Sequence, residues 1–249
     1  MSELNSRTAI VTGASRGFGR AIAESLHAAG ATVVTISRTP PTPAVAARGG
    51  GGTGGIAAVV ADAADERVAG TLVAEHRPRV LVLNAGAVPA MGPLHTLSWD
   101  DFSRNWQVDT RHAFVWVREA LRAPLPPGST VVTISSGAAL RGSPVSGGYA
   151  GAKAAIRFLT AYAAEESERA GLGIRFATLL PQLTPTTDLG RAGVGAYAAR
   201  AGVDPEAHAA NMGPVLTPHV VAEAVRAVVT GAARDPEYLV TADGLRPIP

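Results

Sequence analysis

The sequence predicts an α/β protein, built on a doubly wound parallel sheet of about seven strands that is flanked by helices on both faces. Short apolar runs alternate with longer amphipathic stretches along the whole chain. The short runs are rich in β-branched residues and almost continuously apolar, which favours parallel strands buried on both faces. Strand and helix patterns that alternate in this way are typical of doubly wound sheets. No repeat or linker interrupts the alternation, so we expect residues 1–249 to form one domain.

The strands and helices can be assigned in chain order. The predicted strands are Thr8–Thr12, Thr32–Ile36, Ile56–Val60, Val80–Leu83, Thr130–Ile134, Ile174–Leu180 and Tyr238–Thr241. The predicted helices are Gly19–Ala29, Ala64–His76, Trp99–Arg122, Tyr149–Ala170 and Pro218–Thr230. Two segments break the alternation. Thr39–Gly55 is rich in Pro and Gly and predicts a flexible surface connection. Gln182–Thr217 predicts at most short helices, and an irregular segment of this length is often a lid or a binding loop.

The composition excludes several classes of protein. The 249 residues are 47% hydrophobic and 17% charged, which indicates a globular chain. There is no cysteine, which excludes disulfides and thiolate metal sites and is compatible with a cytoplasmic location. No apolar run has membrane-spanning length. The net charge is +2 and the arginines are dispersed, so we expect no nucleic-acid partner. Because His112, His208 and His219 lack ligand-like spacing, we expect no metal.

A glycine-rich turn follows the first strand. The segment Thr12–Gly19 (TGASRGFG) leads directly into the first helix. Glycines allow a tight turn and a close backbone approach, and the helix N-terminus offers free N–H groups to a pyrophosphate. The alternative is a tight turn with packing glycines and no ligand. The strand–turn–helix context favours a Rossmann-type dinucleotide site. The predicted contacts from this turn are Gly13, Ser15, Arg16, Gly17, Phe18 and Gly19.

The end of the second strand indicates which dinucleotide binds. A carboxylate there would bind the adenosine ribose diol of NAD, but the chain has Ser37 followed by Arg38. Arg16 lies in the glycine turn nearby. Arginines without a carboxylate favour a ribose 2′-phosphate, so we predict NADP(H) over NAD(H). The alternative is that both arginines are ordinary surface residues.

A tyrosine and a lysine four residues apart open a predicted helix. Tyr149 and Lys153 therefore share one face. A nearby cation lowers the pKa of a phenol, which suits the phenol to proton transfer at neutral pH. Ser136 follows a strand that ends in the same region, and its hydroxyl could polarise a substrate oxygen. The alternatives are a chance helical pair and a serine that only caps a turn.

Lysine usage argues against chance. Lys153 is the single lysine among 22 Lys and Arg residues. Its ammonium is compact and sits on a flexible stem, whereas a guanidinium is broad and planar. Because every other Lys/Arg position of the chain is an arginine, the lysine at 153 suggests that a guanidinium could not replace its ammonium there.

These residues resemble the short-chain dehydrogenase/reductase superfamily over essentially the whole chain. Besides the glycine turn, Asn84-Ala85-Gly86 and Asp62-Ala63 resemble its adenosine-side contacts, and Ser136, Tyr149 and Lys153 have its catalytic spacing. The resemblance implies that Lys153 also binds the nicotinamide ribose. It implies that Pro181 to Thr186 lie along the nicotinamide, and that substrate binds under the loop 182–217. It further implies a homotetramer or homodimer.

The chain departs from that family in three places. Asp109 stands where the family has a fourth catalytic residue, an asparagine. The change is harmless if only the backbone carbonyl matters, and disturbs the proton path if the side chain matters. Gln182 replaces a glycine after Pro181. The helix expected between the second and third strands is largely replaced by the Pro/Gly segment.

The function predicted from the sequence is an NADP(H)-dependent oxidoreductase, most simply a ketoreductase, that acts on a small carbonyl or secondary alcohol. The alternatives are a non-catalytic NADP-binding regulatory protein on the same scaffold, and an imine reductase, epimerase or lyase of the same family. Apolar residues are predicted to line part of the substrate pocket: Val88, Leu140, Val145 and Leu183. Three arginines could meet an anionic substrate or simply be solvated: Arg141, Arg191 and Arg200.

Overall fold

The computed structural model describes residues 3–40 and 55–249, so most of the predicted Pro/Gly connection, residues 41–54, lies outside the described residues. One eight-stranded sheet organises these residues, in the order β3-β2-β1-β4-β5-β6-β7-β8. The first seven strands pair in parallel, and β8 pairs antiparallel with β7. The strands are β1 (Thr8–Thr12), β2 (Thr32–Ser37), β3 (Ile56–Val60), β4 (Val80–Leu83), β5 (Thr130–Ile134), β6 (Arg175–Pro181), β7 (Glu237–Thr241) and β8 (Gly244–Pro247).

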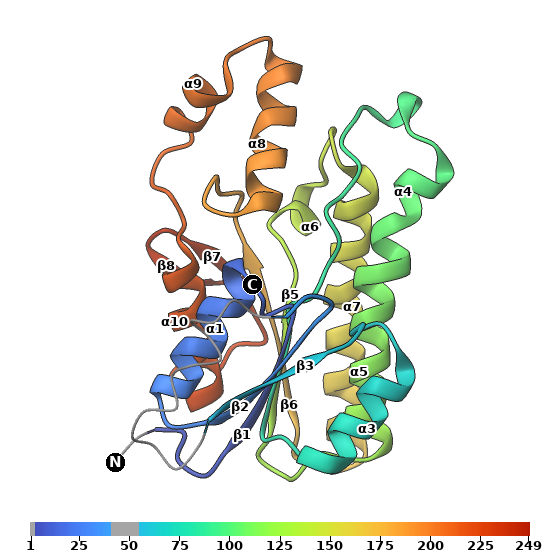
Figure 1. Cartoon of the computed structure of the whole chain (residues 1–249), viewed down its shortest axis with the longest axis vertical. Helices are drawn as coiled ribbons and strands as arrows, with labels where there is room; N and C mark the ends of the chain where they lie inside the picture. The colour runs from blue at the N-terminus through green and yellow to red at the C-terminus, as the bar shows by residue number, and fades with distance from the viewer. Residues whose placement is uncertain (1–2, 41–54) are drawn as a thin grey trace.

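Helices cover both faces of the sheet, as the sequence predicts (Figure 1). The helices over the two faces are α1 (Gly17–Ala28) and α10 (Pro218–Thr230) on one side, and α3 (Glu66–His76), α5 (Arg111–Arg122) and α7 (Gly147–Arg169) on the other. Alternate residues of the buried strands contribute to two separate cores, because successive side chains of a strand point to opposite faces. Val11 packs in the core under α1 and α10, and Ile10 in the core under α5 and α7. None of the helices in the described ranges combines the length and apolarity needed to span a bilayer.

The sheet has one strand beyond the seven predicted, because the chain turns back after β7 and β8 forms an edge where Pro247 is tolerated. One sequence prediction needs correction at the level of elements. The segment Gln182–Thr217 is not limited to short helices, since it contains α8 (Asp188–Ala201), 14 residues long, and α9 (Pro205–Ala210). Thr187 caps α8 by accepting from the Gly190 N–H, and Gly202 ends it in the left-handed conformation.

The predicted helix Trp99–Arg122 is a helical run with a π turn inside it. It consists of α4 (Trp99–Asn105), the π segment η2 (Trp106–Thr110) and α5. A π turn adds a residue to the helical repeat and redirects the side chains around it. Two short elements complete the described part of the chain, η1 (Leu94–Thr96) and α6 (Ala138–Arg141).

The register of the sheet aligns the strand ends that carry the predicted site. Val11 of β1 lies opposite Val82 of β4, and Ile134 of β5 lies opposite Leu179 of β6. The segments that follow these strands therefore leave the sheet at its carboxyl edge. The order of the strands reverses between β1 and β4, the switch point where open α/β sheets bind ligands. Helix α8 lies above this edge in Figure 1.

Candidate active site

A cleft of about 970 Å³ opens at the carboxyl edge of the sheet, under α8. It is lined by nearly all of the predicted site residues: Gly13, Ser15, Arg16, Gly17, Phe18, Ser37, Arg38, Asp62, Ala63, Asn84, Ala85, Gly86, Asp109, Ser136, Tyr149, Lys153, Pro181 and Thr186. Gly19 does not line it and lies directly behind the turn. The structure therefore gathers residues from distant parts of the sequence around one cavity.

The glycine turn has the geometry of a tight, closely packed loop. Gly13 and Gly17 have φ angles of +67° and +56°, which favour glycine. A Cβ atom on Gly13 would lie 2.7 Å from the Ala85 Cα, and a Cβ on Gly19 would lie 2.4 Å from both Asn84 Nδ2 and the Gly13 carbonyl oxygen. Because α1 begins at Gly17, its N-terminal N–H groups lie at the cleft. This arrangement fits a dinucleotide pyrophosphate.

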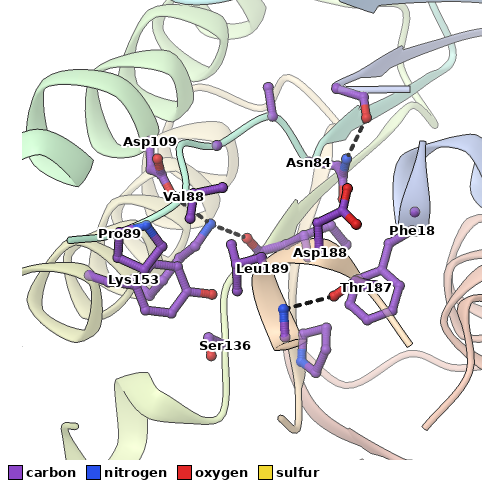
Figure 2. A pocket seen from close by; sticks show the side chains of 18 of the residues that line it. Phe18, Asn84, Val88, Pro89, Asp109, Ser136, Lys153, Thr187, Asp188 and Leu189 are labelled. Carbon is purple, nitrogen blue, oxygen red and sulfur yellow. Dashed lines mark hydrogen bonds and ion pairs between the residues drawn. The ribbon is translucent and has the colours of Figure 1, made fainter. Parts of the chain in front are cut away.

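Asn84 joins the glycine turn to the end of β4. Its Nδ2 donates to the carbonyl oxygens of Thr12 and Gly13, at 3.1 and 3.2 Å. The Thr12 hydroxyl in turn accepts from the backbone N–H groups of Asn84 and Ala85. These reciprocal bonds hold the turn against β4, and Figure 2 shows the Asn84 side chain in this position. Asn84 is thus a positioning residue for the turn.

The tyrosine–lysine pair lies at the start of α7, in the cleft wall. The Lys153 ammonium is buried, 5.6 Å from the centre of the Tyr149 ring. It donates to the Ile134 carbonyl oxygen at 3.1 Å, which anchors it to the end of β5. Ser136 follows the same strand, and its hydroxyl oxygen accepts from the Ala138 N–H at 3.2 Å. The three residues thus share one wall of the cleft.

Asp109 forms a buried ion pair with the lysine. Its Oδ2 lies 3.2 Å from Lys153 Nζ, and the two side chains are 1% and 6% exposed. The Oδ1 atom accepts from the Ala87 N–H at 2.8 Å and from Asn105 Nδ2 at 3.2 Å. A Cβ on Gly86 would lie 2.7 Å from Asp109 Oδ2, so this glycine is needed for the carboxylate to fit. The aspartate is therefore fixed by the π turn, by Asn105 and by the loop after β4. Figure 2 shows Asp109 beside Lys153.

The pair determines the charge of the lysine. Burial alone lowers the pKa of Lys153, but the negative charge of Asp109, the Tyr149 side chain and the hydrogen bond to Asp109 together raise it above its ordinary value. Lys153 is therefore an ammonium at neutral pH despite its burial. The ammonium and the Asp109 carboxylate compensate each other inside the protein.

His112 lines the cleft, a position that the sequence does not indicate. It lies one helical turn after Asp109 and is 2% exposed. Burial, and then the charge of Lys153, lower the pKa of His112 to about 3, so its ring is neutral at ordinary pH. Its Nε2 has no hydrogen-bond partner among the described residues. A histidine in an amphipathic helix carries no sequence signal of this position.

The adenosine end of the cleft contains Ser37, Arg38 and Asp62. Arg38 is exposed at the end of β2, and the residue before it is Ser37 rather than an aspartate or glutamate. Asp62 accepts from the Ala64 N–H at 2.9 Å and closes a turn. Arg16 pairs with Asp188 of α8 at 2.8 Å, both side chains being substantially exposed. Both arginines line the cleft, and Arg38 is the one that lies at the end of the second strand.

The far end of the cleft is mainly apolar. Val88 and Leu183 line it as predicted, whereas Leu140 and Val145 do not. Further apolar lining comes from Pro89, Met91 and Leu189. None of the three arginines considered for an anionic substrate lines the cleft: Arg141, Arg191 and Arg200. In the described part of the chain, no group of three His, Asp or Glu side chains is placed to hold a metal.

Known proteins resemble this chain in sequence and in structure. The family model for short chain dehydrogenases matches residues 7–193. The chain is 28% identical to the 3beta-hydroxysteroid dehydrogenase of Mediterraneibacter gnavus over 166 residues, which cover 64% of this chain but only 60% of that protein. It is 32% identical to the 2,5-dichloro-2,5-cyclohexadiene-1,4-diol dehydrogenase of Sphingobium indicum over 199 residues, which cover 77% of this chain and 78% of that protein.

A solved structure extends the likeness to almost the whole fold. A short chain dehydrogenase from Burkholderia cenocepacia J2315, in complex with NADP, superimposes with a TM-score of 0.79 and 29% identity. The superposition covers 97% of this chain and 98% of that structure. Since the family model matches three quarters of the chain, the chain belongs to the short chain dehydrogenase family.

Proposed function

We propose that the chain is an NADP(H)-dependent ketoreductase that acts on a small carbonyl or secondary alcohol. The observation that supports this most is the convergence of Ser136, Tyr149 and Lys153 on one wall of a dinucleotide-sized cleft. The three residues come from the loop after β5 and from the start of α7. A structural role alone would not require a buried ammonium beside a phenol at the edge of a cavity.

The cleft has the features that a nicotinamide dinucleotide requires. The proposed pyrophosphate site is the glycine turn and the N-terminus of α1, where added Cβ atoms would collide with Ala85 and Asn84. Arg38 would hold the ribose 2′-phosphate, and Asp62 and Ala63 would contact the adenine. Lys153 would bind the nicotinamide ribose, with Pro181 and Thr186 beside the nicotinamide. When bound, the dinucleotide supplies or accepts the hydride.

The side chains of this chain would handle the proton and the substrate oxygen. The Ser136 hydroxyl donates to the carbonyl oxygen and orients it. The Tyr149 hydroxyl gives its proton to the same oxygen during reduction, or takes one from the alcohol in the reverse direction. Lys153 places a positive charge beside the phenol, 5.6 Å from the centre of its ring. Asp109 holds the ammonium in place, so its proposed role is positioning.

The chain's organisation and setting are also proposals. We propose one dinucleotide-binding domain over residues 1–249, with residues 182–217 as a substrate lid that contains α8. A cytoplasmic location stays a prediction from composition.

We further propose a homo-oligomer. The aromatic side chains Phe114 of α5 and Phe158 and Tyr162 of α7 are 46%, 59% and 61% exposed, on two helices that pack side by side. Exposed apolar clusters of this kind mark protein interfaces.

The test is a panel of ketones and secondary alcohols assayed with NADPH and with NADH. We expect ketone-dependent oxidation of NADPH, with NADH used less efficiently. The Arg38→Ala variant should lose most of the preference for NADPH while its turnover with NADH stays unchanged. Tight NADPH binding without turnover of any carbonyl would favour a non-catalytic binding protein. An amine or an epimerised product would instead favour the imine reductase or epimerase alternatives.

A further inference from the structure

Three hydroxyl groups other than those of Ser136 and Tyr149 meet in the wall of the cleft. The Ser143 hydroxyl lies 2.8 Å from the Tyr197 hydroxyl, and the Ser146 hydroxyl donates to Ser143 at 2.8 Å. All three residues line the cleft. They come from two segments far apart in sequence, since Ser143 and Ser146 precede α7, whereas Tyr197 belongs to the lid helix α8.

The cluster holds one more O–H group than it uses. Three hydroxyls provide three donors, and the two bonds among them use two. In the simplest arrangement Ser146 donates to Ser143 and Ser143 donates to Tyr197, which leaves the Tyr197 O–H free. Such a chain polarises its last donor and strengthens it. No other bond from these three hydroxyls occurs among the described residues.

Contacts of Tyr197 on one side and of Ser146 on the other fix the position of the three hydroxyls. The Tyr197 ring stacks on His208 of α9, with the ring centres 6.4 Å apart and the planes 3° apart. Ser146 is the N-cap residue of α7 and is buried. Tyr149 lies three residues after Ser146, in the first turn of the same helix. The cluster and the Tyr149 side chain therefore belong to one cleft, and a ligand in that cleft could contact both.

Apolar side chains line the cleft beside Tyr197. Leu183 and Met91 lie within 4.0 Å of the position of a Cβ atom on Gly193, one helical turn before Tyr197. The charged residues of the cleft lie elsewhere, at the adenosine end, at the glycine turn and at the Asp109–Lys153 pair: Arg38, Asp62, Arg16, Asp188, Asp109 and Lys153. An ionic substrate would lose its hydration without gaining a partner here.

We propose that Tyr197, supported by Ser143, is a specificity-determining residue that binds a second oxygen of the substrate. The substrate is then an uncharged ketone or alcohol with an apolar body and a hydroxyl or carbonyl group remote from the reacting carbon. This inference rests on the proposed function, since it names the substrate class of the same site.

The test compares two matched ketones, cyclohexanone and 4-hydroxycyclohexanone. Their binding to the NADP-saturated protein is measured by calorimetry, and their turnover is measured with NADPH. We expect the wild type to bind the hydroxylated ketone about fivefold more tightly. Tyr197→Phe keeps the ring and should reduce this ratio to near one, while the affinity for cyclohexanone stays unchanged. Ser143→Ala should reduce the ratio in part.

Controls separate this inference from a general effect of mutation and from the proposed function. Tyr162→Phe removes a hydroxyl from an exposed tyrosine outside the cleft and should leave the ratio unchanged. The charged analogue 4-oxocyclohexanecarboxylate should bind at least about tenfold more weakly than the hydroxylated ketone. Equal binding of both ketones by the wild type, a ratio that survives in Tyr197→Phe, or preferred binding of the carboxylate would overturn the inference. Turnover of both ketones without preference leaves the proposed function standing, whereas a binding preference without NADPH oxidation contradicts the proposed function alone.

Discussion

Lys153 and Asp109 depend on each other inside the protein. Removing the ammonium leaves the Asp109 carboxylate buried without its counter-charge, which costs more than the pair itself contributes. We predict that Lys153→Met lowers the free energy of unfolding by about 3 kcal/mol at pH 7. The double variant Lys153→Met/Asp109→Asn should recover about half of the loss, because an amide carries no buried charge.

Urea unfolding of the two variants and the wild type measures this effect. The pKa of Lys153 is raised in the folded protein, so its pairing contributes fully at pH 7 and is lost only as pH rises through that raised value, above 10.5. Equal stability of Lys153→Met and the wild type at pH 7 would show that the carboxylate is not buried against the ammonium.

His112 predicts how stability depends on acid. Its pKa is lowered to about 3 in the fold, against about 6.5 in an unfolded chain, so the unfolded state binds its proton first. Stability is therefore complete above pH 6.5 and falls as the pH drops toward 3. Between pH 6.5 and 5, the wild type should lose roughly 2 kcal/mol more than His112→Gln. The exposed His95→Gln is the control, and stability curves of wild type and His112→Gln that run parallel would refute the burial of a neutral ring.

Several of these residue contacts could not be predicted from the sequence. The spacing of Tyr149 and Lys153 indicates their shared helix face, and the glycine turn is recognisable by its strand–helix context. The Asp109–Lys153 pair, by contrast, requires the π turn, which no hydrophobic period indicates. The contact of Ser143 with Tyr197 joins segments 54 residues apart, and only the folded sheet brings them together.

At the scale of elements, the turn between β1 and α1 depends on the lack of a side chain. A methyl group on Gly19 would collide with Asn84 Nδ2 and with the Gly13 carbonyl. We predict that Gly19→Ala lowers the free energy of unfolding by about 2 kcal/mol and weakens NADPH binding at least about tenfold. Thermal unfolding and a fluorescence titration with NADPH measure the two effects.

Helix α8 offers a matched control for that substitution. Gly195 lies in α8 with open space around its would-be Cβ. Gly195→Ala should stabilise the protein slightly, by about 0.5 to 1 kcal/mol, because alanine favours a helix over glycine. If the Gly19 and Gly195 substitutions had the same effect, the close approach of the turn to β4 would not matter for binding.

Strands were predictable where a short apolar run marks them. Six of the predicted strands are largely buried, as expected of apolar strands that are covered on both faces. The edge strand β3 was predicted from its apolar run too, although its residues are exposed or half-buried. The edge strand β8 has the sequence GLRP and lacks such a pattern. Helix α8 was missed because its three glycines lower helix propensity, whereas the Thr187 cap and its alanines favour the helix.

At the scale of the whole molecule, the exposed aromatic surface on α5 and α7 predicts self-association. Phe158 and Tyr162 stack on each other and are mostly exposed. The double variant Phe158→Glu/Tyr162→Glu places like charges in that surface, so it should lower the molar mass in solution to that of a smaller assembly or a monomer. Light scattering after size exclusion measures the mass. The exposed Trp99→Glu on α4 is the control, and an unchanged mass in the double variant would exclude this surface as the interface.

We propose that Tyr149 transfers a proton to the substrate oxygen beside a bound nicotinamide. The decisive measurement uses the Tyr149→Phe variant, assayed for ketone-dependent oxidation of NADPH and, separately, for NADPH binding. We expect turnover to fall at least about a hundredfold while binding of NADPH is largely retained. Turnover in Tyr149→Phe at the wild-type rate would show that the Tyr149 hydroxyl does not transfer the proton.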